Sequence, residues 1–320
     1  MHQYALVFPG QGSQSVGMGR SLADASPAAA AIFAEADGAL PGPISPLAWD
    51  GPSEELDRTE NAQPALLATS MAYLAALRDT WLDAGIEPPA FAAGHSMGQY
   101  SALVAAGVIS LADGMRLVRE RGRLMQASGH GRDGAMAAVI GLDDGRLPEL
   151  VERASRHGVF GVANRNAPGQ VVVSGERAAI EASVAAGKEL GARKVIVLPV
   201  SVAAHSPLMA QAADGMREVI ATVDFKDPLV PLVANADARE ITTADGARNE
   251  LVEHLTKGVD WVAAVERMAA AGVTTFVEVG PGRVLTGLIR RIAPDAEAVP
   301  LDDGGASGQL NVPFASPSPA

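Results

Sequence analysis

The chain has 320 residues, of which 48% are hydrophobic and 19% are charged, and its formal net charge at pH 7 is −12. This length and composition suit one large α/β domain or a main domain with an insertion, and the acidic excess argues against general nucleic-acid binding. Because the chain contains no cysteine, disulfides, thiolate zinc sites and cysteine nucleophiles are excluded, and serine becomes the main candidate nucleophile. No apolar run reaches the ~18 residues of a membrane span and no signal-peptide pattern precedes the first strand, so we expect a cytoplasmic protein.

The N-terminal part of the chain alternates between strand and helix patterns. An apolar strand over residues 4–8 runs into a glycine-rich loop, and alanine-rich helices are predicted over 20–37 and 61–83. The second helix carries Pro64 in its first predicted turn, where the missing N–H costs no hydrogen bond. After a further short strand, a long helix is predicted over 111–126.

Residues 128–202 have a separate pattern, in which four strands alternate with two helices. The strands are predicted over 135–140, 159–163, 170–174 and 193–197, and the helices over 145–157 and 178–190. The order β-α-β-β-α-β is typical of a ferredoxin-like fold. We therefore predict a ferredoxin-like subdomain inserted at this point of the chain.

The C-terminal part returns to the pattern of the first part. The predicted elements are a helix over 206–221, a strand over 230–235, helices over 247–256 and 259–271, a strand over 275–279 and a helix from Val284. The main domain therefore comprises residues 1–127 and 203–300 and belongs to the α/β class. Residues 301–320 are rich in Gly, Ser, Ala and Pro, and we predict a disordered tail there.

The segment Gly94-His95-Ser96-Met97-Gly98 has the G-x-S-x-G pattern and stands between a short strand and a helix. In such a turn the serine is held outward in a strained conformation, and the helix N-terminus offers N–H groups to an oxyanion. A five-residue pattern also arises by chance in a chain with 34 glycines. The strand-to-helix context nevertheless favours Ser96 as a nucleophile.

Arg121 stands in the middle of an apolar helix face. The other positions of this stripe are Leu117, Val118, Leu124 and Met125. A guanidinium that is buried without an anionic partner costs several kcal/mol, roughly. Two interpretations remain open: a structural salt bridge to a core carboxylate, or a clamp that binds the carboxylate of a substrate bidentately.

Six histidines are candidates for a catalytic base. His205 lies in a loop of small residues between a strand and a helix, and it follows Ser96 in chain order as in hydrolase-type sites. His95 should point away from the serine in a tight turn, and His254 lies inside a helix, where a packing role is the simpler reading. Because no acid between Ser96 and His205 stands clearly at a strand end of the main sheet, we expect a Ser–His dyad. Its imidazole would be oriented by a backbone carbonyl or another side chain.

An oxyanion hole requires two N–H donors. One is expected from Met97, the residue after the nucleophile. The other is expected from Gln11, which lies between two glycines in the loop after the first strand. As an isolated motif this G-x-G is weak, and it need not indicate phosphate binding.

In combination, these segments resemble the malonyl-CoA:acyl carrier protein transacylases of fatty-acid synthesis and the acyltransferase domains of polyketide synthases. The resemblance runs from Tyr4 to about Ile292. It rests on FPGQGSQ at 8–14, GHSMG at 94–98, RGR at 121–123, NRNAPGQVVV at 164–173, VAAH at 202–205 and EVGPG at 278–282.

This resemblance implies an α/β-hydrolase-like core with a mainly parallel sheet and an inserted ferredoxin-like subdomain. It implies that Ser96 is the acylated nucleophile, His205 the base and Arg121 the clamp for the malonyl carboxylate. Gln11 and Met97 would be the oxyanion donors.

Three further residues are expected to line the substrate site, namely Asn166, His95 and Ala204. Ala204 is small where many malonyl-selective relatives carry a bulky residue. This leaves room beside the α-carbon for the extra methyl group of methylmalonyl, unless Met97 fills that space.

The reaction that the resemblance implies is a ping-pong transfer from malonyl-CoA to the phosphopantetheine thiol of acyl carrier protein. It needs no metal or bound cofactor, because CoA is part of the substrate. We expect a monomer that binds neither nucleic acid nor membranes. The alternatives are a serine thioesterase or esterase, and a non-catalytic member that only binds carrier protein.

The chain departs from the family pattern at two positions. His254 stands where many relatives have glutamine, at a position whose backbone carbonyl is implied to orient the catalytic histidine. Gln99 replaces a glutamate that is often found one residue after the last glycine of the G-x-S-x-G turn.

Overall fold

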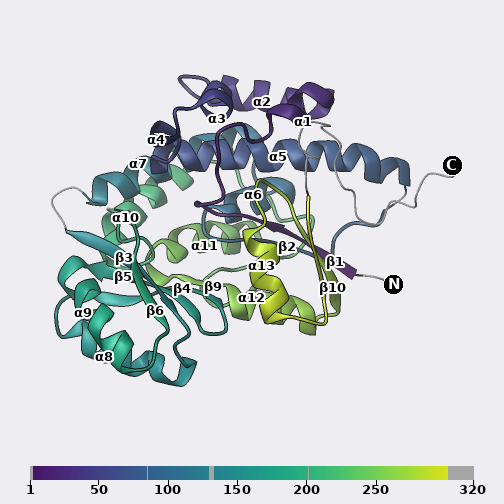
Figure 1. Cartoon of the computed structure of the whole chain (residues 1–320). Coiled ribbons are helices and arrows are strands. Elements are labelled where there is room, and N and C mark those ends of the chain that lie inside the picture. The colour runs from purple at the N-terminus through teal and green to yellow at the C-terminus, as the bar shows by residue number, and fades with distance from the viewer. Residues whose placement is uncertain (1–2, 85, 130–132, 201, 302–320) are drawn as a thin grey trace.

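The computed structural model describes residues 3–84, 86–129, 133–200 and 202–301. Its strands form two sheets (Figure 1), one with the order β11-β10-β1-β2-β7-β8 and one with the order β6-β3-β5-β4-β9. The fold is therefore mixed α/β, as predicted. Except for Leu301, the predicted disordered tail lies outside the described residues.

The larger sheet is parallel apart from one short edge strand. Its strands are β1 (Gln3–Phe8), β2 (Phe91–Gly94), β7 (Leu232–Val233), β8 (Glu240–Ile241), β10 (Val273–Glu278) and β11 (Glu297–Pro300), of which only β8 pairs in an antiparallel manner. Phe8 at the end of β1 pairs with Gly94 at the end of β2. The loops that follow these two strands therefore leave the sheet at the same edge, where ligands of α/β proteins usually bind.

Helices cover both faces of the larger sheet. The helices outside the segment of the smaller sheet are α1 (Arg20–Ala25), α2 (Pro27–Gly38), α3 (Ser45–Asp50), α4 (Ser53–Leu56), α5 (Thr59–Ala84), α6 (Gly98–Ala105), α7 (Leu111–Gly129), η2 (Pro207–Met209), α10 (Ala210–Ile220), α11 (Ala244–Lys257), α12 (Trp261–Ala270) and α13 (Val284–Ile292). Helices α5, α6 and α7 cover one face, whereas α12 and α13 cover the other. Among the described residues, no helix is long and apolar enough to cross a membrane.

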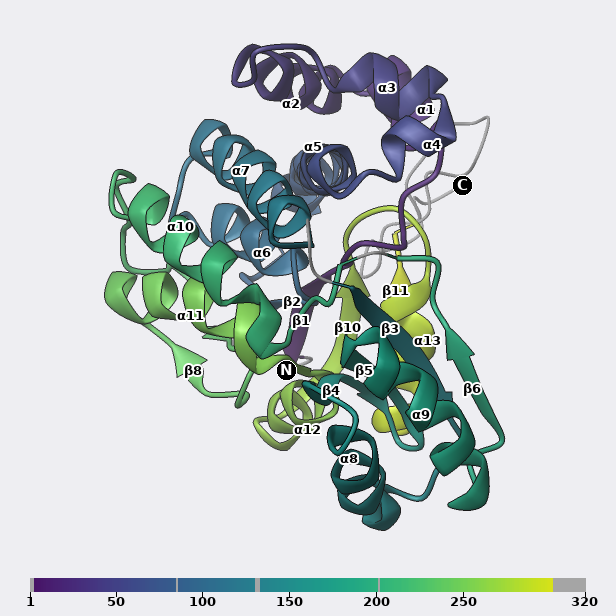
Figure 2. The ribbon, with the colours of Figure 1, turned by 90° about the vertical axis from the view of Figure 1, so that its left-hand side faces the viewer.

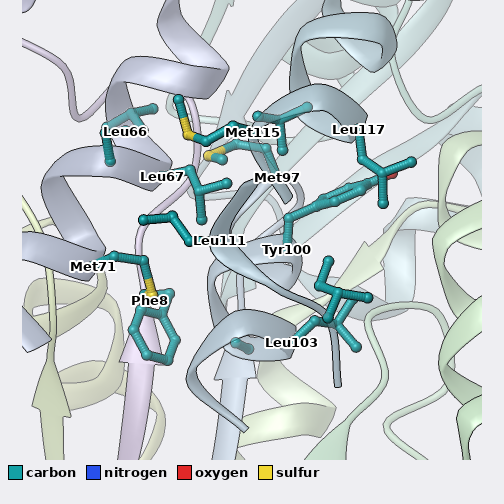
Figure 3. Packing of buried hydrophobic residues seen from close by; sticks show 14 of the residues in the cluster. Phe8, Leu66, Leu67, Met71, Met97, Tyr100, Leu103, Leu111, Met115 and Leu117 are labelled. Atoms are coloured by element: carbon teal, nitrogen blue, oxygen red, sulfur yellow. The ribbon is translucent and has the colours of Figure 1, made fainter. Parts of the chain in front are cut away.

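The side chains of β1 alternate between these two faces. Tyr4, Leu6 and Phe8 belong to the apolar cluster under α5 and α6, and Ala5 and Val7 belong to the cluster under α12 and α13. Figure 3 shows Phe8 in the first cluster, beside residues of α5, α6 and α7. Since both faces of β1 are buried, its sequence is a continuous apolar run, as parallel strands require.

Two helix predictions were wrong in detail. The helix predicted over 20–37 is divided at Ser26, which has an extended backbone (φ −121°, ψ 115°) and caps α2 through a hydrogen bond from the Ala29 N–H. Pro27 explains the break, because the residue before a proline is disfavoured in the helical region. Pro64 lies inside α5 rather than in its first turn, since α5 already begins at Thr59.

The smaller sheet carries the elements predicted for the insertion. They are β3 (Gly134–Ile140), η1 (Asp144–Arg146), α8 (Leu147–Ser155), β4 (Phe160–Ala167), β5 (Gln170–Glu176), α9 (Arg177–Glu189) and β6 (Lys194–Val197). In Figure 2, α8 and α9 lie at the opposite end of the molecule from α2. Three strands were missed. Two of them, β8 and β11, belong to the larger sheet, and the third, β9 (Val259–Asp260), was predicted as the start of a helix but pairs with β4.

Candidate active site

The serine of the G-x-S-x-G segment lies in a sharp turn between β2 and α6. Ser96 has a φ of 53°, in the left-handed region that non-glycine residues rarely adopt, as predicted. A Cβ atom on Gly94 would lie 1.9 Å from the backbone of Gly98, and one on Gly98 would lie 2.2 Å from the Phe8 carbonyl oxygen. Both positions therefore require glycine, and the turn is held tightly against the end of β1.

Ser96 and His205 are in direct contact, as expected for a dyad. The Ser96 Oγ lies 2.8 Å from the His205 Nε2, and the His205 Nδ1 lies 2.6 Å from the backbone carbonyl oxygen of His254. Because a carbonyl oxygen only accepts hydrogen bonds, Nδ1 carries the proton and Nε2 is left to accept from the serine hydroxyl. His205 also has a positive φ of 57°, which marks a second strained residue at the site.

The imidazole of His205 is kept neutral by its surroundings. Burial holds the pKa of His205 well below its usual value, and His254 and Arg121 lower this pKa further. The ring is only 6% exposed. A neutral imidazole at physiological pH can take the serine proton directly.

Arg121 points into the site from α7 and is only 1% exposed. Its Nη1 donates to the Gln63 Oε1 at 2.8 Å and its Nη2 to the Ser96 Oγ at 3.2 Å, while its Nη2 lies 3.4 Å from the His254 Nε2. Its Nε has no hydrogen-bond partner among the residues that the structure describes. Over the part of the chain that the structure describes, Arg121 forms no ion pair with a carboxylate, so the structural salt bridge is not seen.

The loop after β1 lies against the serine turn. A Cβ atom on Gly10 would lie 2.5 Å from the His95 carbonyl oxygen. The Gln11 side chain is turned away to donate to the Thr59 Oγ1 at 3.1 Å. Within the described ranges, the backbone N–H groups of Gln11 and Met97 have no hydrogen-bond partner. Both groups are therefore available as oxyanion donors.

The remaining predicted site residues adjoin the serine turn. The His95 Nε2 is hydrogen-bonded to the Asn166 Oδ1 at 2.8 Å, and its ring packs against Trp261 with centroids 5.7 Å apart. These contacts hold the His95 ring against Asn166 and Trp261, which explains why His205 and not His95 contacts the serine hydroxyl. Asn166 thus reaches the turn through His95, and the half-buried Ala204 directly precedes His205.

Two buried residues that the sequence analysis did not single out support the turn. The Asn235 Oδ1 accepts a hydrogen bond from the Ser96 N–H at 2.8 Å, and the Glu250 Oε1 accepts one from the Asn235 N–H at 2.6 Å. The signal for Asn235 was its position directly after the buried run at the end of a predicted strand. Glu250 gave no comparable signal.

The departure at position 99 has a structural explanation. The buried Gln99 accepts a hydrogen bond from the Gly94 N–H at 3.1 Å and donates one to the Val233 carbonyl oxygen at 3.2 Å, so it links β2 to β7. An ionised glutamate at this position could make only the first of these bonds, because it has no donor.

The sequence matches the family model described as acyl transferase domain over residues 5–301. The chain belongs to the acyl transferase family. Within this family it is 46% identical to the malonyl CoA-acyl carrier protein transacylase of Escherichia coli (strain K12), over 96% of this chain and 98% of that protein. It is 41% identical to the protein of the same name from Bacillus subtilis (strain 168), over 95% of this chain and 94% of that protein.

Solved structures of acyl transferases agree with this assignment. The acyl carrier protein S-malonyltransferase of Vibrio cholerae superimposes with a TM-score of 0.89 at 42% identity, over 94% of this chain and 97% of that one. A malonyl-transacylase in complex with its type II PKS acyl-carrier protein gives a TM-score of 0.90 at 41% identity, over 95% and 97% of the two chains. The resemblance inferred from the sequence is confirmed.

Proposed function

We propose that this protein transfers a malonyl group from malonyl-CoA to the phosphopantetheine thiol of acyl carrier protein through a malonyl ester on Ser96. The observation that carries the proposal is Arg121, a buried cation beside the Ser96–His205 pair that forms no ion pair among the described residues. Such a cation favours an anionic acyl group next to the nucleophile. The names of the similar transacylases support the same substrate and acceptor.

Acylation begins when the Ser96 Oγ attacks the thioester carbonyl carbon of malonyl-CoA. The Nε2 of His205 takes the hydroxyl proton, and the backbone N–H groups of Gln11 and Met97 stabilise the resulting oxyanion. The carbon–sulfur bond then breaks, and the His205 imidazolium gives its proton to the departing CoA sulfur. The His254 carbonyl oxygen holds the Nδ1 proton throughout, so the ring stays aligned.

Transfer repeats these steps in reverse with a different thiol. The phosphopantetheine sulfur attacks the ester carbonyl, His205 removes the thiol proton, and the serine oxygen leaves and takes this proton back. The products are malonyl-carrier protein and the original Ser96 hydroxyl. These steps need no metal or bound cofactor, because CoA enters as part of the substrate.

The malonyl carboxylate is bound by the guanidinium of Arg121. Its Nε–H has no partner among the described residues and is buried, so a carboxylate that accepts from it would satisfy an otherwise costly group. His95, Asn166 and Ala204 line the neighbouring space, and the small side chain of Ala204 leaves room at the α-carbon.

The proposal includes a finer description of the fold. Residues 1–127 and 203–300 form an α/β-hydrolase-like core, and residues 128–202 form a ferredoxin-like subdomain. The mainly parallel larger sheet supports the first assignment, and the β-α-β-β-α-β order with an antiparallel sheet supports the second. We also propose that the enzyme acts as a monomer in the cytoplasm.

The decisive experiment measures the mass of the intact protein after incubation with malonyl-CoA, together with CoA release with and without phosphopantetheinylated carrier protein. We expect a stoichiometric adduct that the variant Ser96→Ala does not form, and sustained CoA release only when carrier protein is present. Sustained release into water alone would identify a thioesterase. The absence of any adduct would leave a protein that only binds carrier protein.

A further inference from the structure

Uncharged groups hold the guanidinium of Arg121. Its hydrogen-bonding neighbours are an amide oxygen, a hydroxyl and an imidazole nitrogen, contributed by Gln63, Ser96 and His254. Burial lowers the pKa of the neighbouring His254, so its imidazole is neutral at physiological pH. A buried arginine is usually balanced by a carboxylate. Here its charge remains uncompensated within the described site.

The nearby carboxylate of Glu250 is separated from Arg121 by the ring of His254. The Glu250 Oε1 lies 3.7 Å from the His254 Nδ1, whereas the His254 Nε2 on the other side of the ring lies 3.4 Å from the Arg121 Nη2. Glu250 is also engaged elsewhere, because it accepts from the Asn235 N–H and lies 3.6 Å from a guanidinium nitrogen of Arg239. It therefore compensates Arg239 rather than Arg121.

Gln63 is the neighbour best placed to fix the orientation of Arg121. It is fully buried on α5, and its Nε2 donates to the Met125 Sδ at 3.7 Å, so the amide oxygen is the atom turned toward Arg121. The two helices approach closely at this point, since a Cβ atom on Gly122 would lie 2.5 Å from the Glu60 Cα. Gln63 therefore has little freedom to move away from the guanidinium.

We infer that Gln63 is a positioning residue that determines acyl-group selectivity: it holds Arg121 by a neutral oxygen and leaves the positive charge to the substrate. This inference rests on the proposed function. A carboxylate at position 63 would form a buried ion pair with Arg121 and compete with the malonyl carboxylate. An apolar residue would remove the acceptor of Nη1 and let the guanidinium turn.

The test compares kcat/KM for malonyl-CoA and acetyl-CoA in the wild type, Gln63→Glu and Gln63→Met. We expect Gln63→Glu to lower the malonyl-to-acetyl ratio by ~10-fold or more, mainly through the KM of malonyl-CoA, because a unit charge this close opposes a second anion strongly. Gln63→Met should lower the ratio less. The matched control is Gln126→Glu, which makes the same change at a half-buried position on α7 and should keep the wild-type ratio.

A merely structural role would slow both substrates equally, so equal losses for malonyl-CoA and acetyl-CoA would overturn the inference. An unchanged ratio in Gln63→Glu would do the same.

If thermal unfolding shows that Gln63→Glu does not fold, a double-mutant cycle with Gln63→Met and Arg121→Ala decides instead. The effect of Gln63→Met on the ratio should vanish when Arg121 is absent, and its persistence would contradict the inference. A wild type that forms no malonyl adduct would refute the proposed function itself, before any variant is compared.

Discussion

The geometry of Ser96 depends on groups that take no part in the proton transfer. Its N–H is held by the Asn235 side chain, and its hydroxyl lies between the His205 Nε2 and the Arg121 Nη2. In the proposed reaction, the guanidinium would stabilise negative charge as it develops on the serine oxygen, while His205 would remove the proton. Both effects would lower the barrier to attack. Only Arg121 is also proposed to bind the acyl carboxylate, so the roles of the two residues should be separable by comparing malonyl-CoA with acetyl-CoA.

Replacing His205 by alanine removes the proton acceptor of the serine. We expect acylation by malonyl-CoA to slow by ~10²–10⁴-fold, the usual effect of losing a positioned base. Stopped-flow measurement of CoA release, or the rate at which the acyl adduct appears, gives this number. A His205→Ala variant with nearly full activity, combined with an inactive His254→Ala variant, would show that the wrong histidine has been assigned as the base.

Replacing Arg121 by alanine should change the choice of acyl group more than the chemistry. A lost buried charge pair is worth roughly 2–5 kcal/mol, so the wild type should prefer malonyl-CoA over acetyl-CoA by ~10²-fold or more. In Arg121→Ala, malonyl transfer should fall steeply and the relative rate of acetyl transfer should rise. The measurement is kcat/KM for malonyl-, methylmalonyl- and acetyl-CoA in both proteins. If the variant kept the wild-type ratio, Arg121 would have only a structural function.

At the scale of elements, the crossing of α5 and α7 brings the first turns of α5 to the acyl site. Gly122 allows this approach, because a side chain there would meet the backbone of Glu60. This crossing places Gln63 and Arg121, which are 58 positions apart in the chain, within hydrogen-bond distance. If Gln63 and Arg121 set the acyl selectivity as inferred, this selectivity should depend on how closely the two helices pack.

Substituting Gly122 by alanine tests this packing. Alanine favours helix formation by ~1 kcal/mol, but overpacking against a backbone that cannot retract costs ~1–3 kcal/mol, so we expect a net loss of stability and a raised KM for malonyl-CoA. The matched control is Gly287→Ala on α13, where no atom lies within 4 Å of the added Cβ. That variant should gain a few tenths to ~1 kcal/mol. Urea unfolding of both variants gives the comparison, and a stabilised Gly122→Ala would contradict the expected clash.

The elements that the sequence predicted well are those with a strong local pattern. The apolar run of β1 and the stripe around Arg121 on α7 are properties of neighbouring residues and could be identified from the sequence. The two-residue strand β9 could not, because Val259 and Asp260 are a strand only through pairing with Asn164 and Arg165.

The same limit applies to the site. The G-x-S-x-G pattern and the loop position of His205 are local signals. The contacts of Asn235 with Ser96 and of Gln63 with Arg121 span 139 and 58 positions, respectively. No periodicity or motif encodes such contacts, and they became visible only when the chain was folded.

At the scale of the whole molecule, we expect the carrier protein to be acidic, in which case the net charge of −12 opposes its approach at long range. Attraction must therefore come from local basic residues. Near the C-terminal end of α13, Arg290 donates to the Ala298 carbonyl oxygen and Arg291 to the Pro168 carbonyl oxygen. Part of their hydrogen-bonding capacity is therefore used within the protein. Arg132, which the sequence also offers as a basic docking residue, lies outside the described residues.

We predict that the exposed residues Lys188 on α9, Arg193 in the following loop and Lys194 on β6 form a docking cluster for carrier protein. Reversing these charges to glutamate should raise the KM for carrier protein and leave the rate of acylation by malonyl-CoA unchanged, because the cluster lies outside the serine site. Salt should weaken carrier-protein binding in the wild type more than in the variant. If the kinetics with carrier protein are the same in both proteins, docking occurs elsewhere.

Stability should depend on pH through the three histidines of the site, of which His205 and His254 are buried and His95 is half-buried. Burial lowers the pKa values of His95, His205 and His254 in the folded protein, so the unfolded chain binds more protons below the ordinary histidine pKa of ~6.5. The free energy of unfolding should therefore fall as the pH drops from 7.5 to 5.5. Urea unfolding at both values measures it, and His254→Gln should show a smaller fall. Equal stability at the two pH values would mean that these histidines titrate normally.

The pairing of β9 with β4 has a consequence for the autonomy of the insertion. Strand β9 lies outside the proposed insertion 128–202, directly before α12, and it pairs with β4 at the edge of the smaller sheet. A fragment cut at the boundaries of the insertion would lack this strand, and the edge of β4 would be left to pair with other molecules. The smaller sheet is therefore built from two separate segments of the chain. We expect a fragment that contains it to stay monomeric in solution only if residues 259–260 are included.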